Sequence, residues 1–426
     1  MFPPHLKLIA IFSKQVYNNT NKAKIQLLVS FNFCEVYMKF LHTADWHLGV
    51  KTNGRDRFEE QKQVLDEIIS MVNYENVDCV IIAGDVFNTA SPSADAEELF
   101  FETIEKLSNG GDRFVFVLAG NHDDPTRLAA GLPLAGKHNI ALVSSLDKLK
   151  LTSFNKNAVV RVVETGKGYV KIQKNEEIVT IAYLPYPSDT RMADKLDADL
   201  SYAEKVKEWA NISASVFRED TFNIFVSHLF MVGSKTTDGE VKVGDIMAVP
   251  KNMLPKADYT ALGHIHTPQD LGDGVHYAGA ITALSVGQKN LGVTLFETEN
   301  GKMISKQVTP LKSVAKYEKV SVTSIEEAEE KLLDYDNHDI VELEIIQNEP
   351  LSASRIKALK KEFSCISNIS LVRNFEAEAS ASGKNRKHLN DTELFMQFYK
   401  SVRGFDAPQE LVELFVECKG ENNETN

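Results

Sequence analysis

The sequence predicts an α/β protein built on a mostly parallel sheet, with its chemistry at the carboxyl ends of the strands. Short apolar runs alternate with longer stretches of helical periodicity, which is the pattern of successive βαβ units. One run, "RFVFVL" at residues 113–118, continues directly into "AGNHD" at residues 119–123. Open α/β sheets carry their sites just beyond the carboxyl ends of the strands, so an amide, an imidazole and a carboxylate in that place indicate chemistry.

The first three strands and two helices follow one another between residues 38 and 123. "MKFLHTADWH" opens as a strand, and "RFEEQKQVLDEIISMVNY" has apolar side chains at helical spacing. "DCVIIAGD" predicts a second buried strand, a second helix follows it, and "FVFVLAGNHD" predicts a third strand. In order, these segments cover residues 38–47, 57–74, 78–85, 93–107 and 114–123.

The later strands extend this pattern. Residues 149–183 predict short β-hairpins, which makes the sheet mixed. "NIFVSH" then ends at His228, and "DYTALGHIH" runs through Gly263 into His264 and His266. Because the carboxyl ends of parallel strands meet at one edge of a sheet, we expect five strands to bring their polar residues to the same edge.

These strand ends supply the ligand types of a two-metal site. Two divalent cations about 3.5–4 Å apart need one bridging carboxylate and several further O and N donors. Asp85, directly after Gly84, is the expected bridge. Mixed imidazole, carboxylate and amide ligands without thiolate favour Mn, Fe or Zn over Ca or Mg. Each motif alone is weak, but five segments with the same kind of ending favour a metal site strongly.

Length and composition agree with a globular enzyme. The 426 residues suffice for two or three domains, and the four cysteines form no CxxC pair, as expected for the cytoplasm. A net charge of −13 argues against DNA binding through a global positive field. No apolar segment is long enough for a transmembrane helix, so we expect no membrane contact. Residues 1–37 contain no motif and predict an extension outside the fold.

The ordered motifs DxH, GD, GNHD, H and GHxH resemble those of the calcineurin-like metallophosphoesterase superfamily. This resemblance implies a β-sandwich flanked by helices around a dinuclear metal centre. Within the superfamily, residues 38 to the C-terminus resemble the SbcD family of nucleases, through "FLHTADWHLG", "GDVFNTASPS", "LAGNHD" and "GHIHTPQ".

The resemblance also implies roles for single residues. One metal is held by Asp45, His47, Asp85 and His266, and the other by Asp85, Asn121, His228 and His264. His122 is then free for catalysis, either to stabilise charge on the phosphorus or to protonate the departing ribose oxygen. Asp123 is expected to orient a neighbour rather than to bind metal.

The sequence departs from the related Ser/Thr phosphatases at two positions. Those enzymes typically read GDxxDR, whereas Asn88 and Thr89 stand here at the Asp and Arg positions. Asn88 is still able to hydrogen-bond His122, but it cannot raise the imidazole pKa as an ionised carboxylate would. The change disfavours a phosphomonoesterase.

The chain continues for more than a hundred residues past His266, and this part predicts further units. We expect a metallophosphoesterase nuclease domain at 38–313, a β-α-β-α-β domain at 314–378, a linker at 379–389 and a helical tail at 390–420. By resemblance the second domain constrains DNA over the metals; a packing or dimerisation role is the alternative. The tail carries an apolar stripe expected to bind a partner, with docking back on the catalytic domain as the alternative: Leu394, Phe395, Phe398, Tyr399, Leu411, Leu414 and Phe415.

By this resemblance the protein is a metal-dependent DNA nuclease subunit with two divalent metal ions, Mn²⁺ being the expected metal. It implies exonuclease action on duplex ends and endonuclease action on single strands or hairpins, in DNA repair, recombination and replication. The implied partners are DNA, the SMC-like ATPase SbcC and a second copy of the chain. A small-molecule or cyclic-nucleotide phosphoesterase and a non-catalytic scaffold remain alternatives.

Overall fold

The computed structural model describes most of the chain between residues 37 and 372, together with short segments on either side. The described ranges are 8–12, 29–33, 37–188, 190–192, 196–197, 199–236, 247–347, 351–372, 391–403, 406–409, 411–412 and 415. The predicted linker at 379–389 lies outside them, as does Leu414.

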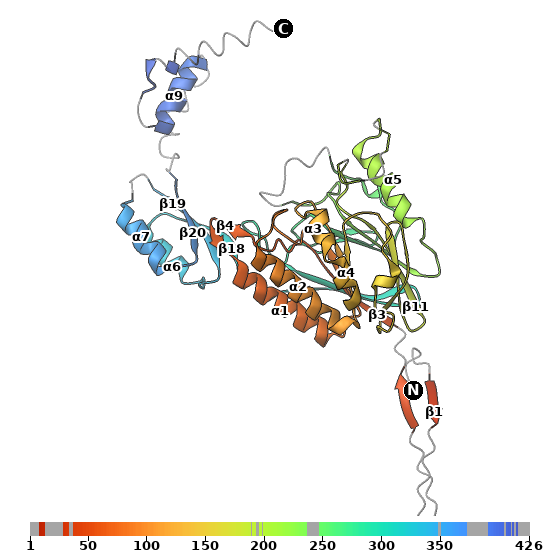
Figure 1. The fold of residues 1–426 in the computed structure, drawn as a ribbon. Coiled ribbons are helices and arrows are strands. Elements are labelled where there is room, and N and C mark those ends of the chain that lie inside the picture. Colours follow the sequence, from red (N-terminus) through yellow and green to blue (C-terminus); the bar gives the residue numbers. More distant parts are fainter. Residues whose placement is uncertain are drawn as a thin grey trace, which may run out of the picture.

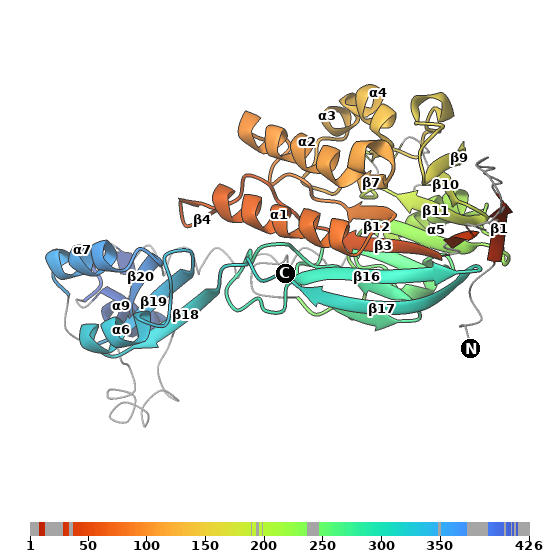
Figure 2. The ribbon, with the colours of Figure 1, turned by 90° about the horizontal axis from the view of Figure 1, so that it is seen from below.

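Two mixed sheets form a sandwich (Figures 1 and 2). The six-stranded sheet has the order β17-β16-β3-β6-β7-β8, and β3, β6, β7 and β8 are parallel. Its strands are β3 (Tyr37–Thr43), β6 (Cys79–Ala83), β7 (Phe114–Leu118), β8 (Ile140–Val143), β16 (Gly292–Glu299) and β17 (Lys302–Pro310).

The seven-stranded sheet has the order β14-β15-β13-β12-β11-β10-β9. Its centre, from β11 to β15, is parallel, whereas β9, β10 and β11 pair antiparallel as the hairpin prediction requires. The strands are β9 (Arg161–Gly166), β10 (Tyr169–Lys174), β11 (Glu177–Leu184), β12 (Phe222–His228), β13 (Tyr259–Gly263), β14 (Gln269–Gly272) and β15 (Val275–Tyr277).

Alternating side chains of the six-stranded sheet bury two hydrophobic layers. Phe40, Ile81 and Phe116 pack with residues of the other sheet, so one core lies between the sheets. Val80 and Val115 point the other way and pack beneath helices. These helices are α1 (Phe58–Tyr74), α2 (Ala94–Ser108), α3 (Pro125–Ala130) and α4 (Leu132–Ala135), while α5 (Tyr202–Ala214) packs on β11. The prediction of a β-sandwich flanked by helices is confirmed.

The expectation that five strands share one sheet edge is wrong. β3, β6 and β7 belong to the six-stranded sheet, whereas β12 and β13 belong to the seven-stranded sheet. Strand periodicity reports burial on each face but not which strands pair, so the division leaves no signal in the sequence. The two sheets nevertheless meet at their carboxyl ends, because the His264 amide donates to Asp45 Oδ1 over 3.0 Å.

A small α/β unit follows β17, and we define it as residues 317–347 and 351–372. Its parallel sheet has the order β18-β19-β20 (Figure 2). Ser324 caps the first helix by accepting from the Glu327 amide, as its capping-box spacing predicts. The elements are β18 (Tyr317–Val322), α6 (Ile325–Leu332), β19 (Ile340–Ile346), α7 (Ala353–Glu362) and β20 (Ile366–Val372).

Three further elements lie outside these sheets. β1 (Leu8–Phe12) and β2 (Val29–Phe33) pair with each other as a separate two-stranded sheet within the predicted extension. β4 (Lys51–Thr52) and β5 (Arg55–Asp56) form a short hairpin before α1, and α9 covers Asp391–Arg403. Among the described helices, none has both the length and the apolar character needed to cross a membrane.

Candidate metal centre

The loops after β3, β6, β7, β12 and β13 converge at one end of the sandwich. Three overlapping groups of ligand atoms there each lie within 4.8 Å of one another. Asp85 and His47 each belong to two of these groups, so the groups form one cluster. The groups are Asp45 with His47 and His266, His47 with Asp85 and His122, and Asp45 with Asp85 and His228.

The backbone is unusual at the ligands themselves. Asp45, His47, Asp85 and His264 all have positive φ, at 51°, 44°, 48° and 100°. Non-glycine residues rarely adopt this region, and such strain is concentrated at functional sites where the surrounding structure holds it. The sharp turns bring side chains from strand ends back over the sheet edge.

Gly84 explains why "GD" follows β6. Its φ is 94°, and a Cβ at this position would lie 2.2 Å from His228 Nδ1. Any larger residue would therefore push the His228 ring of the other sheet away from Asp85. The glycine is required for the two sheet ends to approach each other.

Asp85 lies at the centre of the cluster and is 1% exposed. Its Oδ2 is 3.3 Å from His228 Nε2 and 3.6 Å from His47 Nε2, while Oδ1 accepts from the His122 amide over 2.8 Å. Burial raises the pKa of this carboxyl, but the imidazoles of His228, His47 and His122 outweigh burial and hold it below its usual range. The carboxylate is therefore charged and faces imidazoles from both sheets.

His47 is buried without a hydrogen-bond partner on either ring nitrogen. Such an orphaned imidazole is costly unless a ligand satisfies it. Burial lowers the pKa of His47 to about 3, so its contact with Asp85 is not an ion pair and its lone pair is free to bind a cation. Burial likewise lowers the pKa of His264 to about 3 and that of His266 to about 4.

His228 differs from these three imidazoles. Burial lowers its pKa, but the Asp85 carboxylate outweighs burial and raises the pKa to about 9. Its Nδ1–H donates to the Ala83 carbonyl over 2.9 Å, which directs Nε2 towards Asp85 and Asn121. A cation bound at Nε2 would displace a proton, so metal uptake at this residue is coupled to proton release.

Asn121 joins the two sheets from the amide side. Its Oδ1 lies 3.0 Å from His228 Nε2 and 2.9 Å from His264 Nδ1. The amide oxygen and two ring nitrogens thus converge, as expected for shared ligands of one cation. The donors assigned by resemblance to a second metal therefore lie together.

His122 stands at the open side of the cluster and is exposed. Its Nδ1 is 2.8 Å from the backbone carbonyl of Asn88, and its Nε2 is 4.0 Å from Asp85 Oδ2. The contact with residue 88 therefore runs through the main chain and not through the side-chain amide that the sequence suggests. A backbone acceptor fixes the proton on Nδ1 and turns Nε2 towards the site, whatever side chain stands at position 88.

Asp123 supports the loops and is fully buried. Its carboxylate accepts from the amides of Phe87 over 2.9 Å, Val86 over 3.2 Å and Gly120 over 2.8 Å. Burial and the charge of Asp85 raise the pKa of Asp123 to about 6. With both oxygens occupied by amides, it ties the turn after β6 to the turn after β7, which supports the orienting role.

Gln61 on α1 supports the site although it belongs to none of the sequence motifs. Its side-chain amide donates to the carbonyls of Trp46 and His47 over 3.0 and 2.9 Å, and its oxygen accepts from the Gly49 amide over 3.0 Å. It thereby holds the turn that carries His47. A signal was present, because Gln61 falls on the buried stripe of α1 with Leu65, where a polar residue needs a reason.

A hairpin of the sandwich contacts the small α/β unit. Arg55 on β5 donates to the carbonyls of Asp339 over 2.8 Å, Ser364 over 3.4 Å and Asn337. Asn53 donates to Glu342 over 3.1 Å. Beneath these contacts a small apolar cluster spans both parts: Ala283, Leu291, Tyr317 and Ile340.

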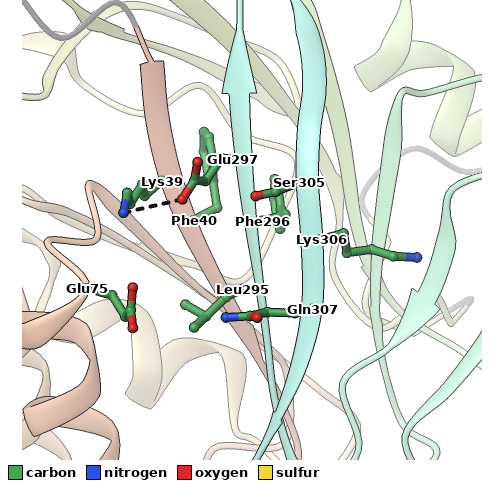
Figure 3. Close-up of a pocket in the computed structure, with 9 residues that line it drawn as sticks. All are labelled: Lys39, Phe40, Glu75, Leu295, Phe296, Glu297, Ser305, Lys306 and Gln307. Atoms are coloured by element: carbon green, nitrogen blue, oxygen red, sulfur yellow. Dashed lines mark ion pairs between the residues drawn. The ribbon is translucent and has the colours of Figure 1, made fainter.

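A separate pocket lies where β3, β16 and β17 run side by side (Figure 3). Lys39 and Glu297 form an ion pair of 3.2 Å at its wall. Lys39 stands near the start of β3, whereas the candidate ligands follow the end of that strand. The pocket is therefore distinct from the metal centre.

Two facing mixed sheets with Asp, Asn and His ligands at their joined carboxyl ends define a two-metal phosphoesterase. The chain belongs to the calcineurin-like phosphoesterase family, whose model matches residues 38–268. Its sequence is 32% identical over 399 residues to SbcD, the nuclease subunit of SbcCD, of Bacillus subtilis (strain 168), and the match covers 89% of this chain and 97% of that protein.

Solved structures also resemble this one. The crystal structure of TT1561 of Thermus thermophilus matches 65% of this chain and 99% of its own, with a TM-score of 0.35 and 13% identity. A dimetal phosphatase from Danio rerio matches 64% of this chain and 99% of its own, with a TM-score of 0.36 and 10% identity.

Proposed function

We propose that the protein is the nuclease subunit of an SbcCD-type complex and hydrolyses phosphodiester bonds of DNA with two divalent metal ions. The observation that carries the proposal is the convergence of five strand ends, in which every motif position holds a side chain able to bind metal or to act on substrate. The similarity to the Bacillus subtilis nuclease SbcD over 89% of the chain supports the nuclease assignment.

The residues present fit two metal ions, with Mn²⁺ as the expected metal. The orphaned nitrogens of buried His47, beside charged Asp85, provide the test. When bound, such a metal pair lowers the pKa of a water molecule and neutralises charge on the phosphodiester. Asp85 would bridge the two ions. Asp45, His47 and His266 would complete one site, and Asn121, His228 and His264 the other.

The chain's own contribution to the reaction centres on His122. Its Nδ1–H is held by the Asn88 carbonyl, so Nε2 faces the site. From there the imidazole, when protonated, stabilises charge that develops on the phosphate oxygens or gives its proton to the departing ribose oxygen. Because the side chain is 43% exposed, it has access to solvent protons between turnovers.

The small α/β unit favours a polymeric substrate over a small molecule. Arg55 and the apolar cluster around Tyr317 attach this unit to the sandwich next to the β4–β5 hairpin. A small-molecule phosphoesterase needs no second domain, whereas a nuclease uses one to constrain DNA near the metals. With a net charge of −13, the chain would hold DNA through local contacts and the metal ions.

A cleavage assay separates this proposal from its alternatives. With Mn²⁺, the full chain should cut hairpin and single-stranded DNA, and it should degrade duplex ends when the ATPase partner is present. A phosphomonoester should be a poor substrate, and a cyclic nucleotide should serve as the second comparison. Fast turnover of either small molecule without DNA cleavage would favour the small-molecule enzyme, and no turnover of any substrate would favour the scaffold.

The tail is the proposed binding site for SbcC. In α9, Phe398 is 65% and Leu394 39% exposed. Phe395 instead stacks on Phe415, with ring centroids 4.3 Å apart, so one part of the predicted stripe folds on itself. The exposed part is the apolar face that a partner would cover.

Deletion of residues 389–426 tests the tail. The shortened chain should keep metal-dependent cleavage of single strands and lose ATP-dependent processing of duplex ends. Copurification with SbcC at full stoichiometry would contradict the role of the tail. As part of the same proposal, two copies pair through helices of the catalytic domain, where Leu134 and Phe101 are 72% and 42% exposed, and the complex works in the cytoplasm.

A further inference from the structure

We propose that Arg191 is a positioning residue that holds the loop of Asn121 and His122 in its metal-binding shape. No sequence motif includes Arg191. Its Nη1 donates to the Gly120 carbonyl over 2.5 Å, and its Nη2 donates to the carbonyls of Asn121 and Asp123 over 2.9 Å each. One guanidinium thus binds three main-chain carbonyls of a four-residue loop.

The need for this contact follows from the position of the loop. Residues 120–123 come after the end of β7, so the strand ladder does not satisfy their carbonyl groups. A guanidinium is planar and always charged, and its fixed fork reaches several acceptors at once. On the other side of the loop, Asp123 binds the Gly120 amide over 2.8 Å. The loop is therefore held from both its donor and its acceptor side.

The segment that carries Arg191 also contacts the imidazole partners of Asn121. The Tyr186 amide donates to the Ala119 carbonyl over 3.2 Å. The Tyr186 ring stacks on His264 with centroids 6.2 Å apart, and the Arg191 guanidinium lies over the same ring at 5.5 Å. Arg191 thus supports Asn121 through the backbone and His264 through Tyr186.

The consequence is specific to one half of the centre. Asn121 and His264 belong to one proposed metal site, whereas Asp45, His47 and His266 belong to the other. The guanidinium contacts backbone of the loop and the Tyr186 ring, so its effect on metal binding passes through Asn121 and His264. This inference rests on the proposed two-metal function.

The experiment compares Arg191→Ala, Arg191→Lys and wild type as full-length chains, with Mn²⁺ titrated by calorimetry and by paramagnetic resonance. In Arg191→Ala, the Mn²⁺ affinity of one site should fall about 10- to 100-fold, the usual cost of losing a supporting contact, while the other site keeps its affinity. Arg191→Lys should recover part of the loss, because an ammonium group carries charge but lacks the fork. Arg127→Ala is the matched control, since Arg127 binds Glu97 at the surface over 2.9 Å.

Three results are decisive. Weakening of one site, with turnover at saturating Mn²⁺ restored to within about 3-fold of wild type, supports the positioning role. Equal weakening of both sites, unchanged affinity at both, or loss of turnover that Mn²⁺ does not restore in both variants would overturn it. A wild-type chain that binds fewer than two ions would instead contradict the proposed function, so the two failures are distinguishable.

Discussion

The metal centre and the junction with the small α/β unit are built in opposite ways. At the metal centre, Asp45, Asp85 and His228 are at most 1% exposed, and backbone amides and carbonyls of neighbouring loops fix their orientation. At the junction, Arg55 and Asn53 reach across from a two-strand hairpin to bind exposed and half-buried groups.

This difference separates two tasks. Buried, mutually oriented groups are preorganised for chemistry, and removing one leaves its partners unsatisfied. Polar contacts at a partly exposed junction are worth about 1 kcal/mol each, so the junction can adjust without loss of the fold. We therefore expect substitutions at the metal centre to affect every substrate, and substitutions at the junction to affect long substrates selectively.

The largest effect is expected for Asp85→Ala. The bridging carboxylate contacts groups of both sheets, so its loss should remove both metals and reduce cleavage of every substrate to background. Metal content by mass spectrometry and DNA cleavage should be measured together. Asp220→Ala is the control, because Asp220 pairs with Arg218 at the surface. Two ions still bound to Asp85→Ala would refute the bridging role.

His122→Gln should lower turnover by about 10²-fold or more, the usual scale of acid–base assistance, with metal content and DNA affinity retained. The reason is that His122 faces the site but is bound through the Asn88 carbonyl rather than enclosed by the cluster. His138→Gln, a change at an exposed histidine, serves as the control. Parallel loss of metal and activity would make His122 a ligand.

Arg55→Ala should separate the two regions. Loss of its contacts to the small α/β unit should lower degradation of duplex ends by about 10-fold, equivalent to one charge-assisted hydrogen bond. Hydrolysis of a small activated phosphodiester should stay within about 2-fold, because the metal centre is untouched. Arg218→Ala at the surface is the control. An equal fall on both substrates would show that the junction is not independent of the chemistry.

The smallest effect is expected for a chain that starts at Met38. β3 begins at Tyr37, and this truncation removes the Tyr37 ring, over which Lys174 lies at 5.6 Å. Lys174 keeps its 2.9 Å ion pair with Asp78, so the melting temperature should change by no more than about 3 °C, and cleavage should be unchanged. An insoluble or inactive product would show that residues 1–37 belong to the fold.

Much of the fold was readable because each strand carries local signals. The run at Phe114–Leu118 is apolar and short, and the structure makes it the fully buried strand β7. Helix α2 starts after Ser93, whose side chain caps it, as the predicted start at residue 93 requires. The assignment of strands to two sheets was not readable, because pairing depends on contacts between residues far apart in the sequence.

The sequence by itself determined the candidate ligands and their order, because Asp85, Asn121 and His264 each follow a strand through a glycine that lets the chain turn sharply. Only the tertiary structure decided that Asn121 meets His264 from the opposite sheet, and that Gln61 and Arg191 hold the loops beside them. The physical reason is that these supporting contacts join side chains to main-chain carbonyls. Every residue has such a carbonyl, so the acceptors leave no pattern in the sequence.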